Sequence, residues 1–298
     1  MLISIVVPSR TGQVDGLHKQ LRCQSLQGWE LVVQQGTAPP ARARNLAAAR
    51  AQGKLLIFLD DDIQLGHEHL LAEMVEALRT IDASSAVAVG WRLPSDATPF
   101  QRRQMKDSFD KPMASGGERL VAIPWYGIGA SCFVIRRRTF EVLGGFDEQL
   151  VSGEDPEFWY RLSLAGGRPY LLSGRWIYHY PPRTIAALIR RTIWYESGNA
   201  QVMLKHPSSG YRITLKDRWH AVLYLTARTI ALVPLMFVKV SYHNRRPTFA
   251  FRPMAALLSY IGAWAYCLSW FSVQPTGTGQ APRAEAGSMS MHPQQVLR

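Results

Sequence analysis

Short apolar runs alternate with helical patterns along the first part of the chain. Buried strands are predicted at residues 2–7, 30–34 and 54–59, and helices lie between them at 14–27 and 41–52. Strands and helices that alternate in this way form βαβ units, in which helices cover both faces of a parallel sheet. The pattern therefore predicts an α/β fold with ligands at the carboxyl ends of the strands.

The middle of the chain is less regular. The pattern predicts helices near 67–80, 137–143 and 155–165, and strands near 85–91, 131–135, 169–172 and 175–179. Glycine pairs end the second and third of these helices, as is typical of C-caps. Residues 95–120 carry mixed charges and a Gly116-Gly117 pair, which is typical of a loop.

From residue 184 the pattern changes to long helices, at about 184–204, 217–240 and 253–272. The last contains MAALLSYIGAWAYCLSWF, which has no charge and would make about 27 Å of helix, barely enough to cross a bilayer. Three interpretations stay open: an interfacial or re-entrant helical hairpin, one true crossing, or ordinary buried helices. The tail is rich in Gly, Pro, Ser and Gln, and we expect disorder there.

The composition excludes several classes of protein. Of the 298 residues, 47% are hydrophobic and 19% are charged, which excludes wholesale disorder, collagen-like repeats and a pure membrane bundle. Cys23, Cys132 and Cys267 are odd in number and widely spaced, so they fit neither a disulfide framework nor a zinc cluster. A reducing compartment is expected, and the opening run LISIVVP does not have the pattern of a secretory signal.

The formal net charge of +12 is concentrated in one segment. Residues 183–252 hold 12 Lys and Arg against Glu196 and Asp217, and so account for +10 of it. These basic residues bracket two apolar runs and lie among tryptophans and tyrosines, which favours an anionic membrane surface as a partner. A solvated face on soluble helices is the plainer alternative. Because no nucleic-acid motif is present, no nucleic acid is expected as a partner, despite a pI near 9.9.

The segment FLDDDI runs from an apolar strand straight into Asp60, Asp61 and Asp62. Three adjacent carboxylates repel one another unless a cation neutralises them, and Asp60 and Asp62 can point to the same side of the strand. Oxygen ligands in this density suit Mg²⁺ or Mn²⁺, and such cations commonly bind substrate phosphates too. The alternative is an acidic turn that caps the following helix.

A second acidic segment, GGFDEQLVSGEDPEFWYRLSLAGG, places Glu154 and Asp155 at the start of a helix. Pro156 is expected at the first helical position, and a carboxylate that caps the helix is a plain alternative to a catalytic role. The preceding Gly145-Phe146-Asp147 and the following Arg161 favour the catalytic role.

These segments, in their order and spacing, resemble those of family 2 glycosyltransferases. The resemblance covers about residues 1–200 and rests on IVVPSR, ARNLAAARAQGKLLIFLDDD, RRTFEVLGGFDE, EDPEFWYRLSLAGG and IYH. It implies the GT-A fold, with a Rossmann-like, mixed and mainly parallel sheet that has helices on both faces and is followed by C-terminal membrane-associated helices. The expected organisation is a catalytic domain at 1–205, a basic, helical, membrane-associating region at 206–273 and a disordered tail at 274–298.

The resemblance also implies roles for single residues. Asp60 and Asp62 would hold a divalent metal, Mn²⁺ or Mg²⁺, on the diphosphate of a nucleotide sugar, and His179 would be a third ligand. Asp155 would be the catalytic base, and Glu154 would orient the acceptor or the helix start.

The resemblance further implies a set of donor-binding residues: Pro8, Ser9, Arg10, Arg44, Asn45, Asp60 and Asp61. For Arg10 and Arg44, a plain surface charge is the alternative. In this set the guanidinium of Arg44 would meet phosphate oxygens. Gln34-Gln35 stand where many relatives carry an acidic pair, so the nucleobase stays open.

Two further groups of residues keep two interpretations each. One group lies where relatives shape the acceptor pocket, although core packing explains its aromatic pair as well: Trp125, Tyr126, Gly127 and Gly129. The other group lies on a helix that in relatives closes over the donor or contacts the membrane: Arg190, Arg191, Trp194 and Tyr195.

The implied reaction is a metal-dependent, inverting transfer of a sugar from a nucleoside diphosphate to a hydroxyl of a membrane-linked or envelope-glycan acceptor. The partners implied are the nucleotide sugar, a lipid-linked or glycan acceptor and an anionic membrane surface. The expected location is the cytoplasmic face of the inner or plasma membrane, with peripheral or monotopic attachment.

Two alternatives to this reaction stay open. One is a non-catalytic membrane-surface protein that binds carbohydrate, which the intact Asp60, Asp62 and Asp155 disfavour. The other is a nucleotidyltransferase that makes sugar nucleotides. It would need a glycine-rich basic loop after the first strand, and PSRTGQVDG is not such a loop.

Overall fold

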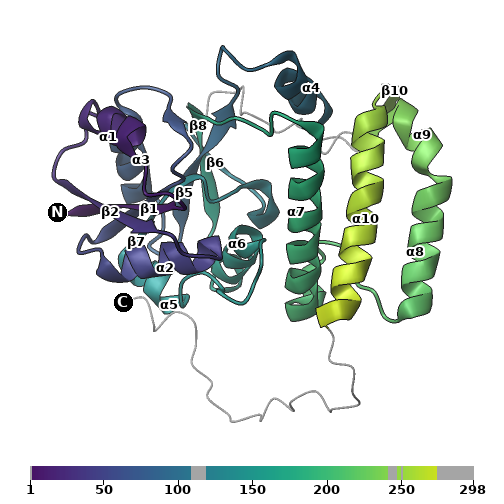
Figure 1. Ribbon diagram of the computed structural model, residues 1–298. Helices are drawn as coiled ribbons and strands as arrows, with labels where there is room; N and C mark the ends of the chain where they lie inside the picture. The colour runs from purple at the N-terminus through teal and green to yellow at the C-terminus, as the bar shows by residue number, and fades with distance from the viewer. Residues whose placement is uncertain (1, 109–118, 241–246, 250, 274–298) are drawn as a thin grey trace, which may run out of the picture.

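A computed structural model describes residues 2–108, 119–240, 247–249 and 251–273 of the chain. Its main sheet has eight strands (Figure 1): β1 (Ile3–Ser9), β2 (Trp29–Gln35), β3 (Leu55–Leu59), β4 (Gln64–Leu65), β5 (Ala86–Arg92), β6 (Leu120–Ala122), β7 (Cys132–Arg136) and β8 (Pro169–Tyr178). The strand order is β2-β1-β3-β7-β5-β8-β4, and β6 pairs with β8. Strands β1, β2, β3, β5 and β8 run in one direction, and β4, β6 and β7 run against them. The prediction of a mixed, mainly parallel sheet is confirmed.

Six helices accompany this sheet in the described part of the chain: α1 (Asp15–Arg22), α2 (Pro40–Arg50), α3 (Leu70–Arg79), α4 (Pro99–Ser108), α5 (Arg137–Val142) and α6 (Glu154–Leu164). Alternate residues of β3 face two separate cores, one on each side of the sheet. Leu55, Ile57 and Leu59 face a core with α1 and α3, whereas Leu56 and Phe58 face a core with α2, α5 and α6. Helices thus cover both faces of the sheet, as predicted from the alternating pattern.

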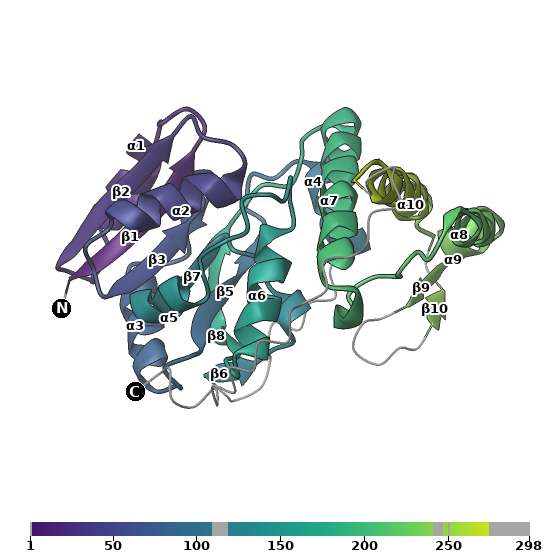
Figure 2. The same cartoon turned by 90° about the horizontal axis from the view of Figure 1, so that it is seen from below.

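The C-terminal part adds a row of helices beside the sheet domain: α7 (Ile185–Lys205), α8 (Arg218–Ile230), α9 (Leu232–Phe237) and α10 (Pro253–Val273). Helix α7 stands between the sheet domain and α10, and α8 and α9 lie on the far side of α10 (Figures 1 and 2). A small core that includes Met203, Tyr266 and Trp270 joins α7 to α10. A two-stranded sheet of β9 (Val238–Val240) and β10 (Pro247–Phe249) follows α9.

Several boundaries differ from the predicted ones. The expected helix at 217–240 is two helices followed by a strand, because Pro234 has no backbone N–H and cannot extend a long helix. The strands expected at 169–172 and 175–179 are one strand, β8, which contains Gly174 at a φ of 72°. The first helix ends at Arg22 rather than at residue 27.

The stretch at 95–120, expected to be a loop, was predicted wrongly in its first half. It contains α4, and the side chains of Gln101 and Gln104 donate hydrogen bonds of 2.7 Å to the carbonyls of Pro181 and Pro182. These bonds tie α4 to a distant segment, a tertiary contact that charge pattern alone does not reveal. Residues 109–118 of that stretch, and the tail at 274–298, lie outside the described residues.

Helix α10 is long and apolar enough to cross a membrane by length and composition. The candidate span is Pro253–Ser272, with a mean hydropathy of 1.3, and 39% of it is buried inside the protein. Other apolar side chains of the helical row are exposed, among them Trp219, Leu223, Ile230 and Leu268. Crossing, interfacial binding and a partly buried soluble helix are all compatible with this helix.

Candidate active site

Two of the predicted metal ligands, Asp60 and His179, lie at the same edge of the sheet. Asp60 follows β3, and its backbone N–H donates a 3.1 Å hydrogen bond to the carbonyl of Ser131. His179 follows β8, and its N–H bonds to the carbonyl of Arg92 at the end of β5. Because β3, β5 and β8 run in one direction, their carboxyl ends meet here. Asp60 and His179 therefore lie at the carboxyl ends of parallel strands, which is where the alternating pattern predicts ligands to bind.

Arg44 of α2 joins the two acidic segments. Its Nη1 donates to Glu154 Oε1 at 2.6 Å, and its Nη2 donates to Asp60 Oδ1 at 2.7 Å. The side chains of Arg44 and Glu154 are 7% and 8% exposed, so this is a buried pair. Burial lowers the pKa of Arg44, but the charges of Asp60 and Glu154 outweigh burial and raise it. The cation therefore stays charged and binds both carboxylates.

Asp155 lies next to this ion-pair cluster at the start of α6. Helix α6 begins at Glu154, and its N-cap is Gly153 at a φ of 78°, so neither carboxylate caps the helix, and Pro156 is not at its first position. Burial and the neighbouring charge of Glu154 raise the pKa of Asp155 to about 7, and the charge of Arg44 opposes this shift. Position 129 is a glycine whose missing Cβ would lie 3.3 Å from Asp155 Oδ2. The carboxyl group of Asp155 thus lies close to the Gly129 backbone, where a larger residue would crowd it.

Asp62 and His179 form a second charged pair in the site. His179 Nε2 lies 3.3 Å from Asp62 Oδ2. Burial raises the pKa of Asp62, but the hydrogen bond and charge of His179 and the charge of Arg191 together lower it. Burial lowers the pKa of His179, whereas the hydrogen bond and charge of Asp62 raise it, and the net direction is upward. An imidazolium and a carboxylate stabilise each other here.

The predicted metal set is brought together only in part. Asp62 and His179 are in contact, whereas Asp60 Oδ1 binds Arg44. Within the described residues, no group of three or more His, Cys, Asp or Glu side chains is arranged to hold a metal ion. The chemistry of the Asp62 and His179 pair nevertheless fits a divalent cation that takes its other ligands from substrate phosphates and water.

Some of the predicted donor-binding residues lie at the ends of β1 and β3, whereas Arg44 and Asn45 of α2 bind other parts of the protein. Pro8 and Ser9 end β1, and Ser9 Oγ accepts a 2.9 Å hydrogen bond from the N–H of Gly12, while Arg10 is exposed. Asp61 is half-buried beside Asp60.

Asn45 points instead toward the GGFDE loop, residues 144–148. Its Nδ2 donates to the carbonyl of Phe146 at 2.8 Å, and its Oδ1 accepts from the N–H of Phe146 at 2.9 Å. Asn45 is thus engaged with this loop, and Arg44 with carboxylates.

Helix α7 brings two further polar residues to the site. The charge of Arg191 acts on Asp62, and burial lowers the pKa of Arg191. Burial raises the pKa of Tyr195 to about 12, the charge of Arg191 opposes the rise, and the charge of Asp155 adds to it. Arg191 and Tyr195 are four residues apart in the sequence, a spacing that puts both side chains on one face of a helix. Sequence alone did not reveal that this face lies toward Asp62 and Asp155.

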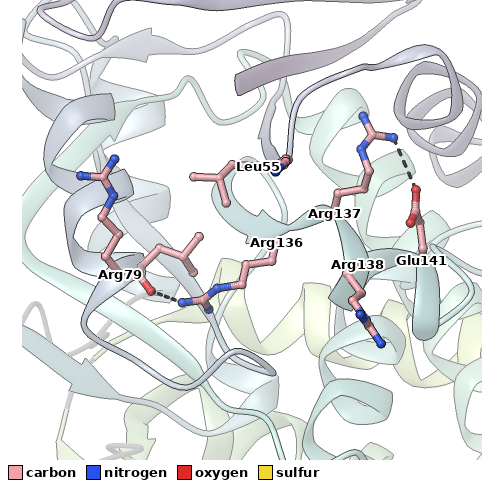
Figure 3. A pocket seen from close by; sticks show the side chains of 8 residues that line it. Leu55, Arg79, Arg136, Arg137, Arg138 and Glu141 are labelled. Atoms are coloured by element: carbon pink, nitrogen blue, oxygen red, sulfur yellow. Dashed lines mark hydrogen bonds and ion pairs between the residues drawn. The ribbon is translucent and has the colours of Figure 1, made fainter. Parts of the chain in front are cut away.

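A hollow of about 590 Å³ lies at the opposite edge of the sheet (Figure 3), lined by Lys54, Leu55, Leu78, Arg79, Arg136, Arg137, Arg138 and Glu141. Its central arginines bind carbonyls at helix ends. Arg136 donates to the carbonyl of Leu78 at 2.8 Å, near the end of α3, and Arg137 donates to Ala48 of α2 at 3.2 Å and to Gly53 at 2.7 Å. Cations at helix C-termini stabilise them, so these arginines have a structural role.

Comparison with known proteins finds one matching family. Residues 24–168, just under half of the chain, match a family described as glycosyltransferase like family 2. Over this segment the chain is similar to that family. The matched segment includes Arg44, Asp60, Asp62 and Asp155, and ends before β8 and α7.

Two curated relatives share part of the chain. An O-antigen biosynthesis protein, RfbC of Myxococcus xanthus, is 28% identical over 42% of this chain and 11% of its own length. A succinoglycan biosynthesis protein, ExoA of Rhizobium meliloti, is 27% identical over 56% of this chain and 52% of its own. The match thus spans about a ninth and about half of these relatives.

Solved structures share the fold. The mannosyltransferase PcManGT from Pyrobaculum calidifontis, in complex with GDP-Man and Mn²⁺, has a TM-score of 0.57 and 14% identity over 90% of this chain and 86% of its own. TarS of S. aureus, residues 1–349, has a TM-score of 0.50 and 15% identity over 91% of each chain. The GT-A fold predicted from the sequence is therefore confirmed.

Replacement of Arg44 by Gln should lower the free energy of unfolding by about 3–5 kcal/mol, because Glu154 would be left buried without its partner. The matched control is Arg42→Gln on the same helix. Arg42 is 59% exposed and 4.0 Å from Glu148, and its loss should cost less than about 1 kcal/mol. Urea denaturation at pH 7 measures both, and equal losses would contradict a bridging role for Arg44.

The Asp62 and His179 pair should make stability depend on pH. The raised pKa of His179 adds stability that is complete below its ordinary pKa of 6.5 and is lost as the pH rises through the raised value. The lowered pKa of Asp62 adds stability that is lost only as the pH falls through that lowered value. In denaturation without divalent cations, His179→Gln should therefore destabilise the protein more at pH 6 than at pH 9. The exposed His69, replaced in the same way, serves as control, and an equal loss at both pH values for His179→Gln would refute the pairing.

Proposed function

We propose that this protein transfers a sugar from a nucleoside-diphosphate donor to a hydroxyl of an envelope-glycan acceptor, with inversion at the anomeric carbon and with Asp155 as the base. The observation that carries the proposal is the Asp155 carboxyl, whose pKa is raised to about 7 beside an ion-paired acidic cluster at the carboxyl edge of the sheet. The match to glycosyltransferase like family 2 and the similarity to O-antigen and succinoglycan biosynthesis proteins support the reaction class and its place in envelope glycan synthesis.

The role of Asp155 follows from its pKa. A general base works best when its pKa is near the working pH, because it is then ionised and still basic enough to take a proton. An ordinary aspartate is a much weaker base. Burial and the charge of Glu154 supply this basicity, and the charge of Arg44, which binds Glu154, limits it. Asp155 would take the proton from the hydroxyl group of the acceptor while the oxygen of that hydroxyl attacks the anomeric carbon of the sugar. At the same time the bond between the anomeric carbon and the diphosphate would break.

The donor diphosphate would lie at the Asp62 and His179 pair. A divalent cation bound there would stabilise the charge that develops on the departing diphosphate. Mn²⁺ in the mannosyltransferase complex from Pyrobaculum calidifontis supports this kind of cofactor. Arg191, whose charge acts on Asp62, would add a second positive group on the same side. Pro8, Ser9 and Arg10, at the end of β1, would hold the nucleoside.

The acceptor is proposed to come from the membrane. The exposed apolar side chains of α8, α9 and α10, together with the basic residues of that region, support contact with an anionic bilayer. A lipid-linked or growing envelope glycan would then reach Asp155 near Gly129, whose lack of a side chain leaves the carboxyl uncrowded. The cytoplasmic face, where nucleotide sugars are made, is the proposed location.

Asp155→Asn should lower kcat by at least about a hundredfold while the donor still binds, because an amide cannot accept the proton. In the wild type, kcat should fall as the pH drops below about 7, where Asp155 becomes protonated. The control is Asp15→Asn, an exposed aspartate in the first turn of α1. Steady-state donor turnover measures both, and an unchanged kcat in Asp155→Asn would exclude this base.

The metal role is tested by donor binding. UDP-, GDP- and dTDP-sugars are titrated into wild type and Asp62→Asn by calorimetry, with Mn²⁺, with Mg²⁺ and with EDTA, in detergent. We expect one donor to bind only with metal, and Asp62→Asn to lose at least about tenfold in affinity. Binding that is equal with EDTA would reject metal dependence, and no binding of any donor would favour the non-catalytic alternative.

A further inference from the structure

The loop that leads into Glu154 and Asp155 takes its contacts from α7. Ser152 Oγ donates a 2.7 Å hydrogen bond to the carbonyl of Trp194. The N–H of Val151 donates to Gln201 Oε1 at 2.9 Å. Trp194 and Gln201 are seven residues apart, about two helical turns, and so lie on one face of α7. This face supports the backbone immediately before the catalytic carboxylates.

Two polar contacts fix the end of α7 to the same region. Lys205 pairs with Asp147 in the GGFDE loop. His206 Nε2 lies 3.0 Å from Oε1 of Glu157, a residue of α6 whose side chain is fully buried and also binds Arg161. The segment from 147 to 157, with Asp155 near its end, is therefore held at four points along α7.

Gly198 shows how close this packing is. A Cβ atom at Gly198 would lie 2.1 Å from Ser152 Oγ and 2.2 Å from the carbonyl oxygen of Ser152. Real Cβ contacts are not this short, so α7 can lie in this position only with glycine here. A displacement of α7 would consequently be transmitted to Ser152 and Gly153.

The opposite side of α7 is packed against α10. A Cβ atom at Gly262 of α10 would lie 3.0 Å from Glu196 Cγ and 3.4 Å from Thr192 Cγ2. Ser269 Oγ of α10 donates a 3.1 Å hydrogen bond to the carbonyl of Ser197. Figures 1 and 2 show α7 between the sheet domain and α10. Glycines at 198 and 262 thus mark close contacts on two sides of one helix.

We propose that α10 positions the catalytic base: its packing on α7 holds the segment 147–157, and so sets the place of Asp155 in the site. This inference rests on the proposed function and adds to it. Helix α10 also exposes Leu257, Trp264 and Leu268, so the side available to lipid is separate from the side that packs on α7. One helix would then serve both the membrane contact and the geometry of the base.

The test displaces α10 without a change in the site. Gly262→Leu forces α10 away from Thr192 and Glu196, and Gly262→Ala is a milder version that serves if the first variant does not fold. The control is Gly16→Ala, a helical glycine of α1 with no atom within 4 Å of the added Cβ. Hydrogen exchange of the full chain in detergent is followed over residues 147–157, and donor hydrolysis is followed with the UDP-, GDP- and dTDP-sugars and Mn²⁺.

We expect amide exchange over 147–157 to become at least tenfold faster in Gly262→Leu, and to change less in Gly262→Ala. The kcat of donor hydrolysis should fall at least tenfold in Gly262→Leu, by a larger factor than the donor KM rises, because four contacts link α7 to the segment of the base whereas α7 gives the donor side only Arg191. Gly16→Ala should match the wild type in all three quantities. Unchanged exchange over 147–157 in a folded Gly262 variant would overturn the inference. Failure of the proposed function is distinguishable, because the wild type itself would then hydrolyse no donor.

Discussion

The ion pairs of Arg44 are the constraint on which the site depends. They join Asp60, at the end of β3, to Glu154, which lies 94 positions further along the chain at the start of α6. Three carboxylates of one sign, those of Asp60, Glu154 and Asp155, gather in a partly buried space, and one buried cation balances two of them. The remaining carboxyl, Asp155, has a raised pKa because it is buried and because the charge of Glu154 adds to the effect of burial. The ion pairs of Arg44 thus affect the chemistry of the site, because Asp155 is the one of these three carboxyls that Arg44 does not bind.

This constraint requires that α2 lies close to the sheet. Ala41, Ala47 and Ala48 are buried in the core beneath α2, and their small side chains let the helix approach the strands. Larger residues would lift the helix, and the Arg44 side chain would no longer reach both carboxylates. Asn45, one position along, binds the GGFDE loop and fixes it in turn. Neighbouring positions of one alanine-rich helix therefore hold both acidic segments in place.

Local pattern predicted much of the fold, because the strand β3 and the helices on either side of it have strong hydrophobic periodicity. The pattern also indicated Asp60, Asp62 and Asp155, since charges that follow a buried strand or precede a helix are conspicuous. The pairing of Arg44 with carboxylates was not predictable, because it joins residues that are distant in sequence. Helix α4 was missed for a related reason: its glutamines bond to carbonyls of Pro181 and Pro182, so a tertiary contact decides a segment with mixed local signals. The predicted set of three metal ligands stays a prediction, with the Asp62 and His179 pair as its observed part.

The contacts of α7 also bear on how the protein is made. A ribosome releases the chain from its N-terminus, so the sheet and the acidic segments emerge before Trp194, Gln201 and His206. The loop before Glu154 cannot form its hydrogen bonds to α7 until those residues have followed. The central sheet can therefore begin to fold during synthesis, whereas the catalytic edge acquires its final form only after α7 has been synthesised.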